Sequence, residues 1–182
     1  MRVEIADELL AQIERLENLV RDLLTYARPR PLSRQPVELH HLLDRVVRIV
    51  KEEEAGESIE WRSSYTEDVE KLLADPQQLE QVFLNLIQNA VQAMENGGCL
   101  TIRTRRLNEH AEIAFHDTGK GIKTADMKRI FQPFFTTRHR GSGLGLAIVR
   151  KIIQRHGGDI QMESRVSEGT TAVVLLPLEA IA

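Results

Sequence analysis

Three glycines precede an apolar, helix-like run near the C-terminal end of the chain. The stretch TTRHRGSGLGLAIV covers residues 136–149 and contains Gly141, Gly143 and Gly145. Glycine destabilises a helix, so a structural requirement must outweigh its cost at these positions. One such requirement is an anion that contacts bare backbone N–H groups at a helix N-terminus. The stretch therefore predicts a loop whose backbone closely approaches a negatively charged group.

The composition of the chain limits its fold and its partners. With 182 residues and 42% hydrophobic content, the chain suffices for one well-buried domain and an appendage. The net charge of −3 gives no general attraction to nucleic acid, so we expect no nucleic-acid partner. The single cysteine, Cys99, has no second cysteine to pair with, which fits a reducing compartment. We expect a cytoplasmic location, with any membrane attachment through segments upstream, because no segment has the apolar length of a membrane span.

The N-terminal segment has the pattern of a bundle-forming helix. Apolar residues alternate at steps of four and three from Leu9 to Ala27, and further leucines widen the stripe. A helix of this kind packs against partner helices. The RPRP sequence at residues 28–31 ends it, because proline removes N–H donors and restricts the residue before it. We predict this helix and a linker over residues 1–31, and a second domain over residues 32–182.

The second domain alternates between helix and strand patterns. Asp75 is the predicted N-cap of a helix that starts at Pro76, and Gln78 is placed to close a capping box. These patterns predict an α+β architecture, a two-layer α/β sandwich with helices on one face of a mixed or antiparallel sheet. The predicted helices cover residues 38–51, 75–95, about 124–130 and 143–156, and the predicted strands cover residues 58–63, about 69–73, and the runs CLTIRTRRL, AEIAFHD, DIQMES and TTAVVLLP.

Two asparagines interrupt the apolar stripe of the predicted helix 75–95. Asn85 and Asn89 are four residues apart, so they share one face of the helix. They are either ordinary solvent-facing amides or polar groups directed at a ligand. An amide oxygen suits Mg²⁺, which prefers hard oxygen ligands. The helix alone does not decide between these interpretations.

The loop DTGKGI, which begins at Asp117, follows a predicted strand. In isolation D-T-G-K-G is an ordinary turn sequence. A carboxylate at a strand end in a partly buried pocket can also accept a hydrogen bond from an exocyclic amine such as that of adenine. The position of the loop after a strand favours this second interpretation.

Four motifs together resemble a known family. In chain order they are QVFLNLIQNAVQAM, DTGKGI, FQPFFTT and GSGLGLAIV. They resemble the N, G1, F and G2 boxes of the ATP-binding domain of sensor histidine kinases, in the superfamily that includes gyrase, the Hsp90 chaperones and MutL. Any one motif is weak, whereas four in this order are specific. The resemblance, which covers about residues 34–178, implies a Bergerat-type ATP-binding fold that binds ATP and Mg²⁺, preceded by the second helix of a dimerisation hairpin.

The resemblance also implies roles for individual residues. Asn89 matches the Mg²⁺ ligand, Asn85 a supporting polar contact, and Asp117 the acid that recognises the adenine amine. Phe131 and Phe134 match the rings that steady a lid over ATP, although packing in the core is an equally good interpretation. The residues implied to bind the nucleotide are Asn85, Asn89, Asp117, Gly119, Lys120, Gly121, Ile122, Phe131, Phe134, Thr136, Thr137, Arg138, Arg140, Gly141, Ser142, Gly143, Leu144, Gly145 and Leu146.

One position departs from the family pattern. Many relatives carry lysine three residues after the metal-binding asparagine, where this chain has Gln92. Arg138, His139 and Arg140 are candidate replacement cations, because guanidinium groups contact phosphate in a bidentate manner. The alternative is a solvated basic loop.

The polar residues of the predicted helix 75–95 also bear on the reaction type. Water-splitting relatives place a glutamate one turn before the metal-binding asparagine, as a general base. This chain has Asn85 there, an amide without useful basicity, and Glu80 falls off that face of the helix. Transfer of phosphate to a better nucleophile than water is therefore favoured.

The resemblance implies an ATP-dependent protein histidine kinase, with relay of the phosphoryl group to an aspartate of a response regulator. None of the six histidines fits the acceptor pattern. We therefore expect a fragment whose acceptor histidine lies on a missing upstream helix, and whose parent protein forms a homodimer through helix 3–27. A nucleotide-gated interaction module without phosphotransfer is the alternative, and a serine kinase related to anti-sigma factors is a weaker third.

Overall fold

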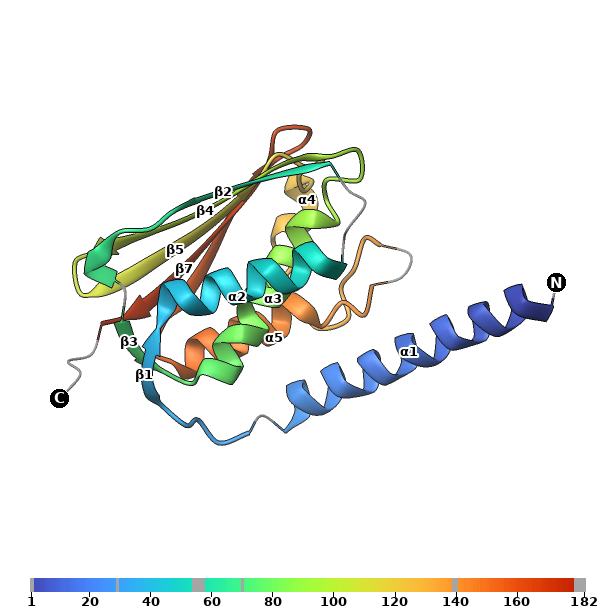
Figure 1. The fold of residues 1–182 in the computed structure, drawn as a ribbon, viewed down its shortest axis with the longest axis horizontal. Helices are drawn as coiled ribbons and strands as arrows, with labels where there is room; N and C mark the ends of the chain where they lie inside the picture. The colour runs from blue at the N-terminus through green and yellow to red at the C-terminus, as the bar shows by residue number, and fades with distance from the viewer. Residues whose placement is uncertain (1, 29, 54–57, 70, 139–140, 179–182) are drawn as a thin grey trace.

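The computed structural model describes residues 2–28, 30–53, 58–69, 71–138 and 141–178 (Figure 1). Its helices are α1 (Arg2–Ala27), α2 (Leu39–Glu53), α3 (Pro76–Val91), α4 (Thr124–Met127) and α5 (Gly145–Arg155), with a 3₁₀ turn at Glu67–Val69. Its strands are β1 (Gln35–Glu38), β2 (Ile59–Ser64), β3 (Lys71–Ala74), β4 (Gly98–Leu107), β5 (His110–Asp117), β6 (Asp159–Arg165) and β7 (Gly169–Pro177).

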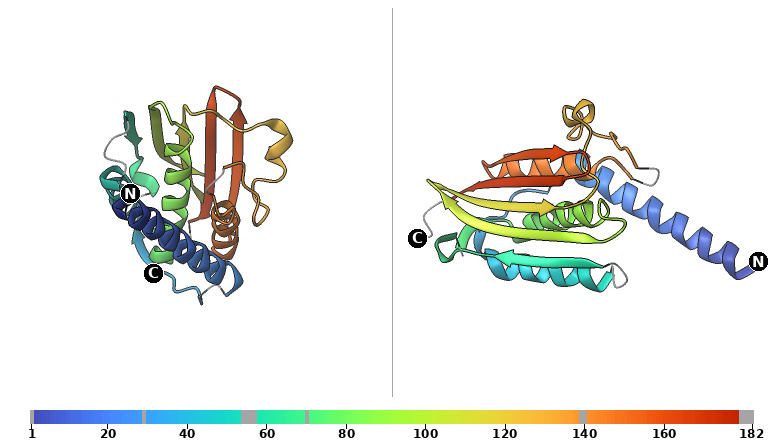
Figure 2. Two further views of the ribbon diagram at one scale, coloured as in Figure 1. Left: turned by 90° about the vertical axis from the view of Figure 1, so that its right-hand side faces the viewer. Right: turned by 90° about the horizontal axis from the view of Figure 1, so that it is seen from above.

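Five strands form a mixed sheet in the order β2-β4-β5-β7-β6. Strands β2 and β4 pair in parallel, and the other neighbours pair antiparallel. The parallel pair requires a crossover, which the chain supplies through the 3₁₀ turn, strand β3 and helix α3. Helices α2, α3 and α5 cover one face of the large sheet, as Figures 1 and 2 show. The predicted two-layer α+β sandwich is therefore confirmed.

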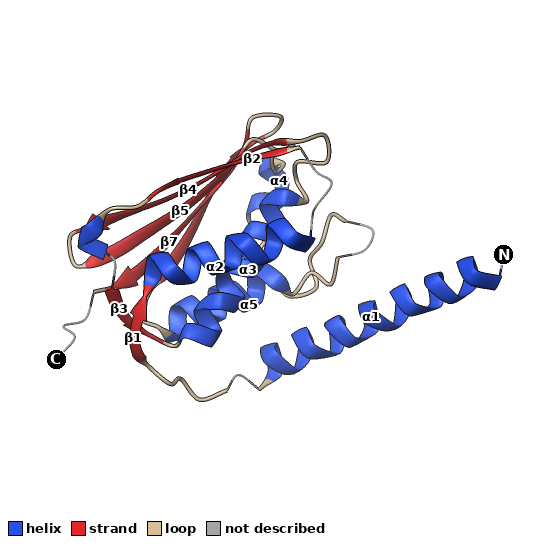
Figure 3. Cartoon of the chain, in the orientation of Figure 1, coloured by secondary structure: helices blue, strands red, loops and turns tan. Residues whose placement is uncertain are grey.

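The core lies between this helical layer and the sheet. Figure 3 shows the helices and the sheet as two layers. Alternate residues of β5 and β7 point into the core between them, which is the period-2 pattern of strands with one buried face. Helix α3 contributes an apolar face at helical spacing and is the central helix of the layer. The fully buried side chains of greatest volume include Phe83, Leu39, Leu43, Leu79, Ile87, Leu100, Ile113 and Ile148.

Helix α3 begins as predicted, but its N-terminal contacts differ from a capping box. The Asp75 carboxylate accepts hydrogen bonds from the backbone N–H groups of Gln77 and Gln78, both at 3.1 Å. The Gln78 side chain donates to the same carboxylate at 3.0 Å. The backbone N–H of Asp75, which a capping box would satisfy with Gln78, donates instead to Nε2 of His156 at 3.0 Å. The predicted box is therefore wrong, because a distant histidine occupies its acceptor position.

Helix α3 ends at Val91, four residues before the predicted end at 95. The N–H of Ala93 is shared between the carbonyls of Asn89 and Ala90, which tightens the last turn. The carbonyl of Ala93 then accepts the N–H of Lys120 at 3.0 Å instead of continuing the helix. The end of α3 is thereby joined to the loop after β5, which brings two of the sequence motifs together.

Helix α1 extends away from the rest of the chain, and its C-terminal half contacts α5 (Figure 1). The Lys151 ammonium donates to the Tyr26 carbonyl at 2.5 Å and lies 4.7 Å from the centre of the Tyr26 ring. Arg155 donates to the carbonyl of Arg30 at 2.8 Å. The predicted heptad seam is exposed at Ile13, Leu16, Val20 and Leu23. Within the described parts of the chain, no helix is both long and apolar enough to cross a membrane.

Candidate functional site

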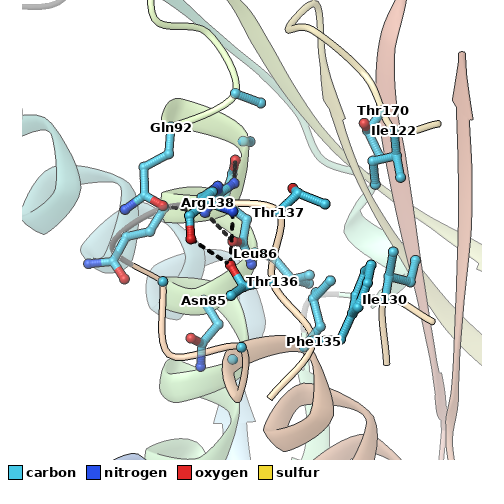
Figure 4. Close-up of a pocket in the computed structure, with 18 of the residues that line it drawn as sticks. Asn85, Leu86, Gln92, Ile122, Ile130, Phe135, Thr136, Thr137, Arg138 and Thr170 are labelled. Carbon is cyan, nitrogen blue, oxygen red and sulfur yellow. Dashed lines mark hydrogen bonds between the residues drawn. The ribbon is translucent and has the colours of Figure 1, made fainter. Parts of the chain in front are cut away.

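A pocket of about 1220 Å³ lies between α3, the loop after β5, and the segment that leads into α5 (Figure 4). It collects residues from all four sequence motifs, which are far apart in the chain. The predicted residues that line it are Asn85, Asn89, Asp117, Lys120, Gly121, Ile122, Thr136, Thr137, Arg138, Gly141, Ser142, Gly143, Gly145 and Leu146. Gly119, Phe131, Phe134 and Leu144 do not line the pocket, and Arg140 and His139 lie outside the described residues.

Asp117 is a buried carboxylate at the end of β5, only 5% exposed. Burial raises the pKa of Asp117, and hydrogen bonds from the backbone N–H groups of Gly119 and Thr170 oppose this shift. The Gly119 bond measures 2.9 Å to Oδ1. These contacts fix the orientation of the carboxylate in the pocket wall. It provides a buried, oriented acceptor for a donor group such as an aromatic amine.

Asn85 and Asn89 are half-buried and both line the pocket from one face of α3. The Asn85 amide donates to the carbonyl of Gln81 at 3.0 Å. The side-chain oxygen of Asn89 accepts a hydrogen bond from Nη1 of Arg138 at 2.8 Å. The carboxylate of Glu80 forms an ion pair with Arg45 on α2 at 2.6 Å, outside the pocket. Thus no general base is supplied to the pocket by Glu80.

Arg138 is the cation at the centre of the view in Figure 4, beside Gln92 and Thr136. Its guanidinium donates to the side-chain oxygens of both Asn89 and Gln92 and to the main-chain carbonyl of Asn89. Burial lowers the pKa of Arg138, although a guanidinium stays protonated in proteins. The interpretation of Arg138 as part of a solvated basic loop is therefore wrong.

The glycines before α5 permit close contacts within the chain itself. Gly143 has a φ of +68°, and a Cβ there would lie 2.5 Å from the carbonyl carbon of Phe134. A Cβ on Gly145 would lie 2.9 Å from the side-chain oxygen of Asn85. Helix α5 starts at Gly145 without a side-chain hydrogen bond to its first turn. Two of the glycines therefore meet packing requirements. In the described part of the chain no side chain caps the start of α5, where the first N–H groups of a helix lack intrahelical partners.

The aromatic motif is arranged differently from the prediction. Phe134 is 62% exposed and has a φ of 63°, so neither core packing nor a pocket contact describes it. Its neighbour Phe135 lines the pocket instead (Figure 4), with the Arg129 guanidinium 4.4 Å from its ring centre. Phe131 packs against the core, with Arg150 over its ring at 5.4 Å. With the left-handed backbone at Phe134, the ring of Phe135 and not that of Phe134 points into the pocket.

The remaining predicted residues shape the pocket less directly. Lys120 pairs with Glu95 at 2.6 Å at the rim. Leu144 is fully buried, and a Cβ on Gly119 would lie 2.6 Å from the carbonyl oxygen of Ala93. Ser142 donates its hydroxyl to Asp22 of α1 at 2.9 Å. Pocket residues that the sequence reasoning missed include Leu86, Phe115, Ile130, Phe135, Met162 and Thr170. Leu86 and Phe135 lie inside two of the four motifs, whereas the other four are residues without a distinctive local motif.

Comparison with known proteins identifies the class. The profile of the histidine kinase-, DNA gyrase B- and HSP90-like ATPases matches residues 74–180, which is more than half of the chain. The chain therefore belongs to this ATPase family. Within it, the chain is 34% identical over 175 residues to the sensor histidine kinase ZraS of Escherichia coli (strain K12), covering 96% of this chain and 38% of ZraS. The similarity to sensor histidine kinases that the motifs indicated is confirmed.

Solved structures agree with this placement. Full-length ShkA in complex with AMPPNP matches 98% of this chain and 39% of ShkA, with a TM-score of 0.87 and 27% identity. The histidine kinase ThkA in complex with the response regulator protein TrrA matches with a TM-score of 0.81 and 29% identity, over 95% of this chain and 50% of that one. The chain thus spans well under half the length of the curated relative, and under half of ShkA.

Proposed function

We propose that this chain is the catalytic portion of a sensor histidine kinase, which binds Mg-ATP and transfers its γ-phosphate to a histidine. One observation carries the proposal: a buried, oriented carboxylate, two pocket-facing amides and an uncapped helix start line one pocket. The carboxylate of Asp117 accepts the adenine amine, and the first turn of α5 faces the phosphates. ShkA, a similar protein, has been solved with AMPPNP.

The pocket also fits a magnesium ion. The side-chain oxygen of Asn89 accepts a hydrogen bond from a cationic guanidinium at 2.8 Å, so this oxygen already interacts with positive charge in the pocket. We assign Mg²⁺ to Asn89, with Asn85 as a supporting polar group. When bound, the ion offsets charge on the triphosphate. The family membership supports ATP itself, and the metal belongs to this proposal.

The reaction class follows from the groups near the pocket. Asn85 is an amide and Glu80 pairs with Arg45, so neither residue activates water. In the proposed transfer, an imidazole nitrogen of the acceptor forms a bond to the γ-phosphorus, the bond to the β–γ bridging oxygen breaks, and ADP leaves. The imidazole proton passes to solvent. The phosphohistidine then supplies an aspartate of a response regulator, the class of partner bound to the similar kinase ThkA.

Helix α1 is proposed as the second helix of a dimerisation hairpin. Its exposed apolar seam at Ile13, Leu16, Val20 and Leu23 supports a homodimer of the parent protein, because such a seam is stable only when partner helices cover it. The acceptor histidine is assigned to the preceding helix. The proposed location is cytoplasmic, where response regulators are found, and any membrane span would belong to upstream segments.

A phosphorylation assay tests the proposed function. The chain is mixed with a separate domain that carries an acceptor hairpin, and γ-labelled ATP is added. We expect a label on the acceptor that is labile to acid and stable to base, and no label when the acceptor histidine is replaced by alanine. An acid-stable label would instead support a serine kinase.

A nucleotide-gated interaction module is the second candidate. The hydrogen bond of Ser142 to Asp22 at 2.9 Å joins the glycine turn directly to α1, so nucleotide binding at the turn can alter the helix. The same assay separates this candidate from the kinase, because it predicts intact ATP binding with no label on any acceptor.

Arg138 and Arg140 give a further prediction. We propose that Arg138 and Arg140 contact the phosphates, in the place of the lysine that Gln92 replaces. Arg138→Ala is expected to weaken ATP binding about tenfold in isothermal titration calorimetry, because a charge-assisted contact to phosphate is lost. Arg140→Ala is expected to act in the same direction. Unchanged affinity in both variants would remove the two arginines from the site.

A further inference from the structure

The Arg138 guanidinium connects the segment that precedes α5 to the C-terminal end of helix α3. Nη1 donates to the side-chain oxygen of Asn89 at 2.8 Å and to Oε1 of Gln92, and Nη2 donates to the main-chain carbonyl of Asn89 at 3.1 Å. Asn89 and Gln92 are three residues apart, so they face the same side at the helix end. Figure 4 shows Gln92 and Arg138 side by side. Three oxygens, two of Asn89 and one of the C-cap residue Gln92, thus accept hydrogen bonds from one cation at the end of α3.

The segment before Arg138 is held in place by its own hydrogen bonds. The backbone N–H of Arg138 donates to Oγ1 of Thr136 at 3.0 Å, and the Thr136 hydroxyl donates to the Arg138 carbonyl at 3.3 Å. This local turn fixes the direction in which the arginine leaves the backbone. The backbone from which the guanidinium reaches α3 is therefore constrained.

The position of Arg138 conflicts with a metal ion on Asn89. The same side-chain oxygen accepts the guanidinium and, in the proposed function, ligates Mg²⁺. A divalent cation bound to that oxygen at ordinary ligand distance would lie within a few ångströms of the guanidinium. At such a short distance two positive charges repel each other strongly in a partly buried pocket. The two cations therefore compete for this oxygen.

We propose that Arg138, Asn89 and Gln92 form a cation latch, in which the guanidinium and Mg²⁺ exclude each other on the Asn89 oxygen. Gln92 is the positioning residue of the latch: it contacts Arg138 and holds the guanidinium on Asn89. Metal binding releases Arg138, which is then available to the phosphates. The latch rests on the proposed function, because it depends on the assignment of Mg²⁺ to Asn89.

The magnesium dependence of ADP binding tests the latch. Binding of a fluorescent ADP analogue at a fixed, subsaturating concentration is measured across a Mg²⁺ titration. In Gln92→Met, which keeps the side-chain length but removes the acceptor, the Mg²⁺ midpoint is expected to fall about three- to tenfold. In Gln77→Met, an exposed position in the first turn of α3, the midpoint is expected to stay at the wild-type value.

A double variant shows whether Gln92 acts through Arg138. Arg138→Met is expected to weaken nucleotide binding overall, and adding Gln92→Met to it is expected to leave the midpoint unchanged. An unaltered midpoint in the single Gln92→Met variant, or an equal shift in both backgrounds, would overturn the latch. Failure of the wild-type chain to bind ADP with Mg²⁺ would be a different result, because it removes the proposed nucleotide site itself and the latch with it.

Limited trypsin digestion provides a readout that needs no nucleotide. Trypsin must bind the Arg138 side chain in its specificity pocket to cleave the following peptide bond, so a latched arginine is protected. Cleavage after Arg138 is expected to be faster in Gln92→Met than in Gln77→Met, with fragments identified by mass spectrometry. Equal cleavage rates would contradict the positioning role of Gln92.

Discussion

Replacement of Asp117 by asparagine is expected to lower the affinity for ATP about a hundredfold, which corresponds to about 2.7 kcal/mol. The carboxylate is 5% exposed and is oriented by the N–H of Gly119 at 2.9 Å. An amine that donates to this buried charge makes a charge-assisted hydrogen bond, which contributes more than a neutral one. Asparagine keeps the shape of the side chain but removes the charge, so the loss reports electrostatics and not packing.

The same substitution is expected to change base selectivity. Adenine presents an exocyclic amine as a donor, whereas guanine presents a carbonyl acceptor at the corresponding position. An asparagine amide can donate to that acceptor, so the preference of Asp117→Asn for ATP over GTP should nearly disappear. Calorimetric titrations with both nucleotides measure this, with Asp159→Asn, an exposed residue at the start of β6, as the control. Retention of wild-type selectivity would show that Asp117 does not contact the base.

The sequence was sufficient for the elements that hydrophobic periodicity specifies. The helix over 38–51, the Asp75 N-cap and the paired strands around Asn108 are all present, because each depends on local patterns of apolar, capping or turn residues. Most of the residues that the four motifs indicated line one pocket, and their role in nucleotide binding stays a prediction.

Contacts between distant residues were beyond sequence reasoning. The left-handed backbone at Phe134 directs Phe135 into the pocket, and no local propensity predicts a φ of 63° for phenylalanine. The contact of Ser142 with Asp22 spans 120 residues, and the contact of Arg138 with Gln92 spans 46. Each depends on how the layers pack and not on the residues adjacent in the chain.

The glycine turn and helix α5 both contact helix α1. Ser142 in the glycine turn bonds to Asp22, and Lys151 on α5 bonds to the Tyr26 carbonyl. Helix α5 therefore contacts the proposed phosphate region at its start and α1 along its length. A change in the turn on nucleotide binding has a short physical route to the helix that the parent protein is proposed to dimerise through.

The second large effect is expected at His156, which is 2% exposed at the end of α5. Its Nδ1–H donates to the carbonyl of Ile152 at 2.9 Å, and its Nε2 accepts the N–H of Asp75 at 3.0 Å. These partners require the neutral imidazole. His156→Ala leaves the Asp75 N–H without a partner and opens a cavity, so the free energy of unfolding should fall by about 3 kcal/mol in urea denaturation.

The role of His156 also predicts how the free energy of unfolding changes with pH. Burial lowers the pKa of His156 in the folded state, so the unfolded chain binds a proton there more readily than the folded chain does. Its stabilising contribution is complete above the unfolded pKa near 6.5 and is lost as the pH falls through the folded value. The free energy of unfolding of the wild-type chain should therefore fall between pH 7.5 and pH 5, in part because of this residue.

A matched histidine variant isolates this contribution. His41→Ala removes an exposed histidine of α2 and should unfold with the wild-type pH profile, whereas His156→Ala should lack the component between pH 7.5 and pH 5. A His156→Ala profile parallel to the wild type would show that the imidazole is not held neutral. Because Asp75 is the N-cap of α3 and His156 the C-cap of α5, such a result would also mean that the hydrogen bond between them does not keep the imidazole neutral at the junction of these helices.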